Sequence, residues 1–141
     1  MKGMAMLAAA ILLASTAQAD EPGTRKAGEW KVMMLGPDGQ PRAPHIFCFA
    51  AGPIDDITKR MDSCSKRDVS KTGDVTVVDA ICTKGQHQIE MHMSITAPTE
   101  DAYTADMHVT YTPSMGGVSD LNMTTQGEFQ GPCAPNVKPA N

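Results

Sequence analysis

Residues 87–112 read HQIEMHMSITAPTEDAYTADMHVTYT, and this segment indicates the fold class most directly. Apolar side chains recur at every second position in both halves, which is typical of β-strands with one buried and one solvated face. Residues 97–100 (APTE) separate the halves, so the stretch predicts an antiparallel hairpin. The alternating positions are His87, Ile89, Met91, Met93 and Ile95, then Tyr103, Ala105, Met107, Val109 and Tyr111.

Further strands are predicted on both sides of this hairpin, separated by short segments rich in Gly and Pro. Consecutive strands with short turns predict an all-β domain, an antiparallel meander that forms a curved sheet or a partial barrel. One short helix is predicted at residues 52–61 (GPIDDITKRM), where Pro53, Asp55 and Asp56 suit a first turn. The other predicted strands are residues 28–35, 45–50, 63–69, 74–83 and a last one that ends at Phe129.

The amino terminus has the pattern of an export signal. Lys2 precedes an apolar run at residues 4–14, and Ala17-Gln18-Ala19 fits the rule for cleavage after Ala19. The run is too short to span a bilayer, which takes about 20 apolar residues. We therefore expect a periplasmic protein that is not membrane-spanning, with a signal peptide at residues 1–19, one domain at 20–133 and a disordered tail at 134–141.

Four cysteines follow this signal, and an even number of thiols in an exported chain predicts two disulfides. A hairpin centred at Gly73 sets Cys64 opposite Cys82, which leaves Cys48 to pair with Cys133. The two other pairings of the four cysteines stay open. Zinc is disfavoured because no close Cys-x-x-Cys pair is present.

Charge is unevenly distributed along the chain. Residues 85–133 contain no Lys or Arg but contain acidic side chains, so this half would repel a phosphate backbone. We therefore expect no nucleic-acid partner. The acidic residues are Glu90, Glu100, Asp101, Asp106, Asp120 and Glu128.

The segment Met91-His92-Met93 raises the question of a soft-metal site, since thioethers and imidazoles suit Cu(I). A turn centred near Glu100 would set His92 opposite His108. Neighbours on a strand point to opposite faces, however, so Met91 and Met93 cannot join His92 around one ion without a bulge. We assign no metal site and no cofactor, and we keep His92, His108, Met91 and Met93 as the candidate ligands.

No catalytic motif is present. The chain has no Gly-x-Ser-x-Gly segment, and Gly116-Gly117 is not followed by the helix or lysine of a phosphate-binding loop. The sequence therefore predicts no catalytic residues and no enzymatic activity.

Several features together resemble a known family. Gly28-Glu29-Trp30 opens a strand soon after the export signal, a cysteine pair straddles a Gly-centred hairpin, and Gly131-Pro132-Cys133 closes the domain. This arrangement resembles domain of unknown function family 3617, small exported proteins of Gram-negative bacteria. The resemblance implies a periplasmic location and a β-rich domain with two disulfides, and it carries over no catalytic residues.

These observations favour a monomeric, non-catalytic envelope or binding module. Its expected partner is a small apolar ligand on the concave side of the sheet, a peptide or an envelope protein. The first alternative is a copper-type, soft-metal binding protein that uses His and Met side chains. A hydrolase with an unrecognised site is a distant third.

Overall fold

The computed structural model describes residues 22–58 and 63–140. The predicted signal peptide, residues 1–19, lies outside the described residues, and so does the end of the predicted helix, residues 59–61. The described chain contains the following elements: β1 (Thr24–Arg25), β2 (Gly28–Leu35), β3 (His45–Phe49), β4 (Gly52–Pro53), the 3-10 helix η1 (Ile54–Thr58), β5 (Cys64–Thr72), β6 (Val75–Lys84), β7 (His87–Thr99), β8 (Ala102–Met115) and β9 (Val118–Gly131).

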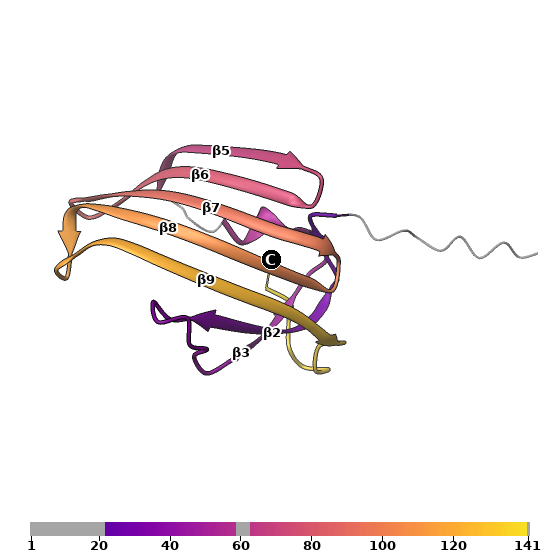
Figure 1. The fold of residues 1–141 in the computed structure, drawn as a ribbon. Coiled ribbons are helices and arrows are strands. Elements are labelled where there is room, and N and C mark those ends of the chain that lie inside the picture. Colours follow the sequence, from indigo (N-terminus) through magenta and orange to yellow (C-terminus); the bar gives the residue numbers. More distant parts are fainter. Residues whose placement is uncertain (1–21, 59–62, 141) are drawn as a thin grey trace, which may run out of the picture.

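One seven-stranded antiparallel sheet dominates the fold, with the strand order β3-β2-β9-β8-β7-β6-β5. Strands β5 to β9 form the predicted meander, and β2 then pairs with β9, so that the early part of the chain extends the sheet (Figure 1). The sheet curves strongly but stays open, because β3 and β5 are its two edges. The predicted all-β meander with a curved sheet is thus confirmed. Strands β1 and β4 form a separate short pair.

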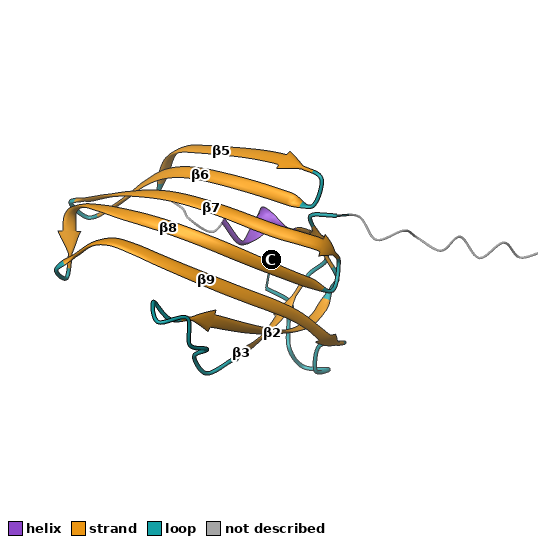
Figure 2. Cartoon of the chain, viewed as in Figure 1, coloured by secondary structure: helices purple, strands orange, loops and turns teal. Residues whose placement is uncertain are grey.

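The predicted helix is a single 3-10 turn, η1, on the concave side of the sheet. It is drawn in purple behind β7 in Figure 2, and it contacts both β6 and β7. Ile54 begins the turn and is only 1% exposed, so it closes the core over this part of the sheet.

Alternation of side chains gives the sheet one dry and one wet face. The concave face holds the core, which includes Trp30, Val78, Ile95 and Val109. Directly paired residues form continuous apolar rows across the strands, since facing side chains lie about 5 Å apart. One such row runs from Val78 through Met93 and Met107 to Met123.

The hairpin of β5 and β6 is centred half a residue later than its sequence predicts. Thr72 faces Val75, so the loop is Gly73-Asp74, and this register alone would place Ser65 opposite Cys82. A register shift between Cys64 and Lys66 restores the pair Cys64–Cys82. The extra residue of this β-bulge was not predicted, because bulges depend on the partner strand.

The cysteines are paired as Cys64–Cys82 and Cys48–Cys133, the pairing that the predicted hairpin register favours. The second disulfide joins Cα atoms 5.6 Å apart and links β3 to the segment after β9. The predicted disordered tail is described as far as Ala140, and there it lies against β3: the Ala140 N–H donates to the Cys48 carbonyl at 2.7 Å. The tail therefore hydrogen-bonds to part of an edge that would otherwise be exposed.

Tyr103 packs flat against Gly127. The two residues face each other on β8 and β9, and a Cβ atom at position 127 would overlap the tyrosine ring. Gly127 pairs regularly with both Tyr103 and Val32, so the register of these strands has no bulge at this glycine. An aromatic ring that covers a strand glycine is a recognised way to fill the missing side-chain volume.

Removing the two disulfides should have unequal effects. We expect the change of Cys48 and Cys133 to Ala to lower the free energy of unfolding by about 4.5 kcal/mol. The change of Cys64 and Cys82 to Ala should lower it by about 3 kcal/mol. The difference arises because the unfolded chain gains more entropy when the disulfide that closes the longer loop is removed. Urea unfolding measures both. Amide hydrogen exchange in β3 and residues 134–140 should rise in the first variant alone, and equal exchange in the two variants would contradict this assignment.

The Gly127→Ala substitution should destabilise the protein by about 1–3 kcal/mol, because the Tyr103 ring must leave its place on β9. Chemical denaturation measures the loss. Ser119→Ala, on an exposed position of the same strand, is the matched control and should change stability by less than about 0.5 kcal/mol. Equal midpoints for the two variants would show that Tyr103 does not need the glycine.

Candidate functional site

The outer face of the sheet brings His92 and His108 to directly facing positions on β7 and β8, as the turn position predicted. Each ring nevertheless bonds to another neighbour. His92 Nδ1 lies 2.7 Å from Asp79 Oδ1, and His108 Nδ1 lies 2.8 Å from Asn122 Oδ1. These partners are on β6 and β9, on opposite sides of the histidine pair. The two imidazoles are therefore held by their outer neighbours.

The carboxylates on this face also have partners. Glu90 accepts a hydrogen bond from Gln88, and Asp106 accepts one from Thr124. Asp120, which the sequence reading did not associate with this face, lies 3.7 Å from His108 Nε2. Its position depends on the register of β9, which no local pattern reveals.

The candidate metal ligands are divided between the two faces of the sheet. His92 and His108 are exposed, while Met91 and Met93 are 5% and 8% exposed within the core. This division follows from the strand alternation. Among the described residues, no three His, Cys, Asp or Glu side chains are placed to hold a metal ion.

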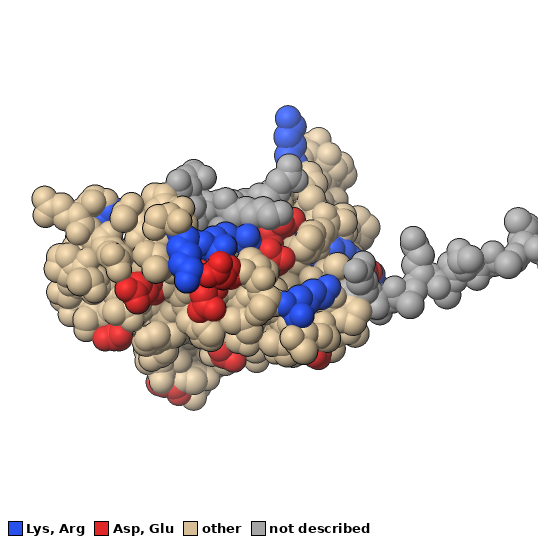
Figure 3. Space-filling model, turned by 90° about the horizontal axis from the view of Figure 1, so that it is seen from above, with Lys and Arg blue, Asp and Glu red and all other residues tan. Residues whose placement is uncertain are grey.

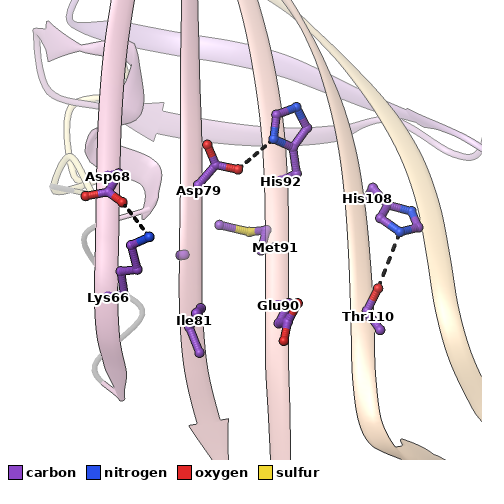
Figure 4. A pocket seen from close by; sticks show the side chains of 10 residues that line it. Lys66, Asp68, Asp79, Ile81, Glu90, Met91, His92, His108 and Thr110 are labelled. Atoms are coloured by element: carbon purple, nitrogen blue, oxygen red, sulfur yellow. Dashed lines mark hydrogen bonds and ion pairs between the residues drawn. The ribbon is translucent and has the colours of Figure 1, made fainter.

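A shallow groove of about 350 Å³ lies on this outer face, and Figure 4 shows its side chains. His92 turns toward Asp79, His108 toward Thr110, and Lys66 toward Asp68 at 3.1 Å. Such exposed pairs contribute little energy and leave few groups available for a ligand. The face seen in Figure 3 likewise mixes positive and negative side chains without a continuous patch of one sign.

The concave face contains a different kind of space, an apolar cavity of about 230 Å³. Apart from the Tyr103 and Thr125 hydroxyls, its lining side chains carry no polar group. Strands that are distant in the sequence contribute to it: β2 and β3 form one wall, and β7, β8 and β9 form the other. The lining residues are Val32, Phe47, Phe49, Met93, Tyr103, Ala105, Met107, Met123 and Thr125.

Small side chains explain why this part of the concave face is hollow. Ala105 faces Ile95 on one side and Thr125 on the other, between rows of much larger residues. The methionine row borders the hollow, and flexible thioethers adapt to irregular spaces and to ligands. Flexible methionine side chains therefore border the space that the small side chain of Ala105 leaves unfilled.

Two phenylalanines from the edge strand β3 form the opposite wall. Phe47 is 43% exposed and stacks on Phe49, with ring centroids 5.6 Å apart. The guanidinium of Arg25 lies 4.8 Å above the Phe49 ring, and Arg25 Nε donates to the Ala50 carbonyl. These contacts hold Phe49 in place, while the outer ring of Phe47 stands at the surface.

Tyr103 is the one ionisable side chain in the lining. It is 7% exposed, and its ring lies 5.8 Å from that of Trp30. Burial raises the pKa of Tyr103 above its ordinary value of 10.0, and the positive charge of Arg25 opposes this rise in part. The side chain is therefore a neutral phenol at physiological pH.

The sequence predicted a concave dry face but did not identify these residues. Phe47, Val32 and Tyr103 lie on separate predicted strands, and the pairing of β2 with β9 brings them together. The aromatic side chains at alternate positions of residues 45–49 (HIFCF) are the signal in the sequence that could have indicated one wall of the cavity, although it was predicted only as a strand.

Comparisons with known proteins identify one family. A family model described as "Protein of unknown function (DUF3617)" matches residues 25–133. The searches of curated proteins and of solved structures gave no match. The two disulfides indicate a non-cytoplasmic environment. Residues 22–58 and 63–140 include no helix with the length and hydropathy of a membrane-crossing segment.

The buried phenol of Tyr103 predicts a pH dependence. Because the folded state favours the protonated form, its stabilisation is complete below pH 10.0 and is lost as the pH rises toward the raised pKa of the folded protein. The free energy of unfolding should therefore fall more steeply above pH 10 in the wild type than in Tyr103→Phe. Urea titrations across this range measure it. Tyr111→Phe should keep the steep fall, and its loss there would refute the assignment to Tyr103.

Proposed function

We propose that this chain, which belongs to the DUF3617 family, is a non-catalytic binding module of the bacterial periplasm that holds a small apolar ligand. The observation that carries the proposal is the apolar cavity of about 230 Å³ between β2–β3 and β7–β9. Small-molecule sites are typically concave, mostly apolar and provided with few polar groups. The cavity has all three properties.

The size of the cavity limits the ligand. An apolar protein cavity of about 150 Å³ is large enough for benzene. A cavity of about 230 Å³ therefore suits a ligand somewhat larger than benzene, such as a substituted single ring. Phe47 lines the cavity and is 43% exposed, so its ring lies where the cavity meets the surface.

The chemistry of the lining supports binding without turnover. Its only ionisable group is the Tyr103 phenol, and neither a carboxylate nor an imidazole lines the cavity. Acid–base and nucleophilic catalysis both require such groups close to the substrate. His92 and His108 lie on the other face of the sheet, and His45, whose ring lies 6.2 Å from that of Phe47, is not part of the lining.

A periplasmic location agrees with the covalent structure. The two disulfides are stable in an oxidising compartment. Residues 1–19 have the pattern of a signal peptide that would deliver the chain there.

Isopropylbenzene is a suitable first probe, and the methionine methyl groups report its position. In protein labelled with ¹³C at the methionine methyls, we expect the signals of Met93, Met107 and Met123 to move on addition of the probe, because these residues line the cavity. The signals of Met33 and Met115, which are not part of the lining, should stay. Shifts restricted to Met33 and Met115 would place binding elsewhere and refute the proposal.

A pair of substitutions tests whether the hollow itself is needed. Ala105→Leu fills the cavity and should weaken isopropylbenzene binding at least tenfold, whereas Thr104→Leu adds the same side chain to the opposite face of β8 and should leave affinity unchanged. Circular dichroism checks that both variants fold.

A further inference from the structure

The cavity contains a hydrogen-bond donor without a protein partner. Tyr103 is 7% exposed and lines the cavity, and within residues 22–58 and 63–140 nothing hydrogen-bonds to its hydroxyl. The hydroxyl oxygen is not among the fully buried side-chain atoms of the described chain that lack a hydrogen-bond partner, so it remains accessible. An accessible donor beside an apolar cavity can donate a hydrogen bond to a ligand that carries an acceptor.

The Tyr103 ring has little freedom to find another partner. It lies flat on Gly127, where no side chain would fit beneath it, and it packs beside Trp30. Trp30 is 1% exposed and is fixed in turn by the bond from its Nε1 to the Lys26 carbonyl at 3.0 Å. The hydroxyl is thus a donor held by packing, and a preorganised donor loses little entropy when a ligand binds.

A second hydroxyl, that of Thr125, lies in the same lining and also has no hydrogen-bond partner within the described chain. Thr125 is opposite Ala105, one position along the concave face from the pair Tyr103–Gly127. Residues related in this diagonal way lie about 7–8 Å apart at their Cα atoms. Two residues with neutral hydroxyl groups therefore line one otherwise apolar cavity.

The other residues of the lining indicate the charge and the aromatic character of the ligand. No cationic side chain is part of the lining, and Arg25, whose charge acts on the Tyr103 phenol, lies over the Phe49 ring. A neutral ligand therefore suits the lining better than an anion, which would lose its hydration without a direct ion-pair partner. Phe47, Phe49 and the methionines Met93, Met107 and Met123 present rings and sulfur atoms. Sulfur atoms and aromatic rings both make favourable contacts with a ligand ring.

We propose that the ligand is a small neutral aromatic molecule with one hydrogen-bond acceptor, such as a carbonyl or ether oxygen, which binds to the Tyr103 hydroxyl. This inference rests on the proposed function and specifies the ligand class for the same cavity. Tyr103 acts as a specificity-determining residue: it favours ligands with an acceptor over hydrocarbons of the same shape. A site with a fixed donor discriminates in this way because the analogue leaves the donor unpaired.

Acetophenone and isopropylbenzene form a matched pair of probes, since they have nearly the same shape and only the first carries a carbonyl oxygen. We expect Tyr103→Phe to weaken acetophenone binding about three- to tenfold, the effect of one net hydrogen bond. The same substitution should leave isopropylbenzene binding unchanged. Tyr111→Phe changes the other tyrosine, which does not line the cavity, and should affect neither probe.

Titration calorimetry or the methionine methyl signals give the affinities, and the melting temperature without ligand gives a second readout. Tyr103→Phe should keep the melting temperature, because the hydroxyl has no hydrogen-bond partner to lose among residues 22–58 and 63–140. An equal loss for both probes, or a lower melting temperature, would overturn the role of the hydroxyl and leave the proposed function in place. If the wild type binds neither probe, the proposed function fails and this inference fails with it.

Discussion

The pairing of β2 with β9 is the constraint on which the rest of the structure depends. It adds the strands β2 and β3 to a meander that would otherwise end at β9, and it turns their aromatic side chains toward the concave face. The disulfide Cys48–Cys133 links β3 to the end of β9 and so supports the same arrangement. Without this pairing the dry face of β7–β9 would have no opposite wall, and there would be no cavity.

The two faces of the sheet differ in how many of their polar side chains have hydrogen-bond partners. On the outer face, His92 and His108 each bond to a neighbouring strand. On the concave face, apolar side chains surround a cavity lined in part by Tyr103, whose hydroxyl has no hydrogen-bond partner within the described residues. An unfilled hollow forfeits van der Waals contacts along its walls, so a bound ligand would also stabilise the fold. The candidate ligand-binding site is therefore on the concave face of the sheet.

Methionine and disulfides have complementary roles in this domain. The core has few aromatic residues, and a row of methionines crosses β7, β8 and β9 at the edge of the cavity. Thioether side chains adapt their shape but specify geometry weakly. The disulfides act at both edges of the sheet, on β3 and on β5, where pairing is one-sided. Rigidity thus comes from the edges and adaptability from the centre.

Local patterns were enough to predict the strands, their dry and wet faces and the facing pair His92–His108, because the two-residue period and short turns are local properties. They did not determine the bulge beside Cys64, the docking of the tail on β3 or the identity of the cavity residues. The cavity residues depend on the pairing of β2 with β9, on Ala105 among larger side chains, and on the Tyr103 ring that lies over Gly127. Only the tertiary structure decides them, since contacts between residues so far apart in the chain leave no period in the sequence.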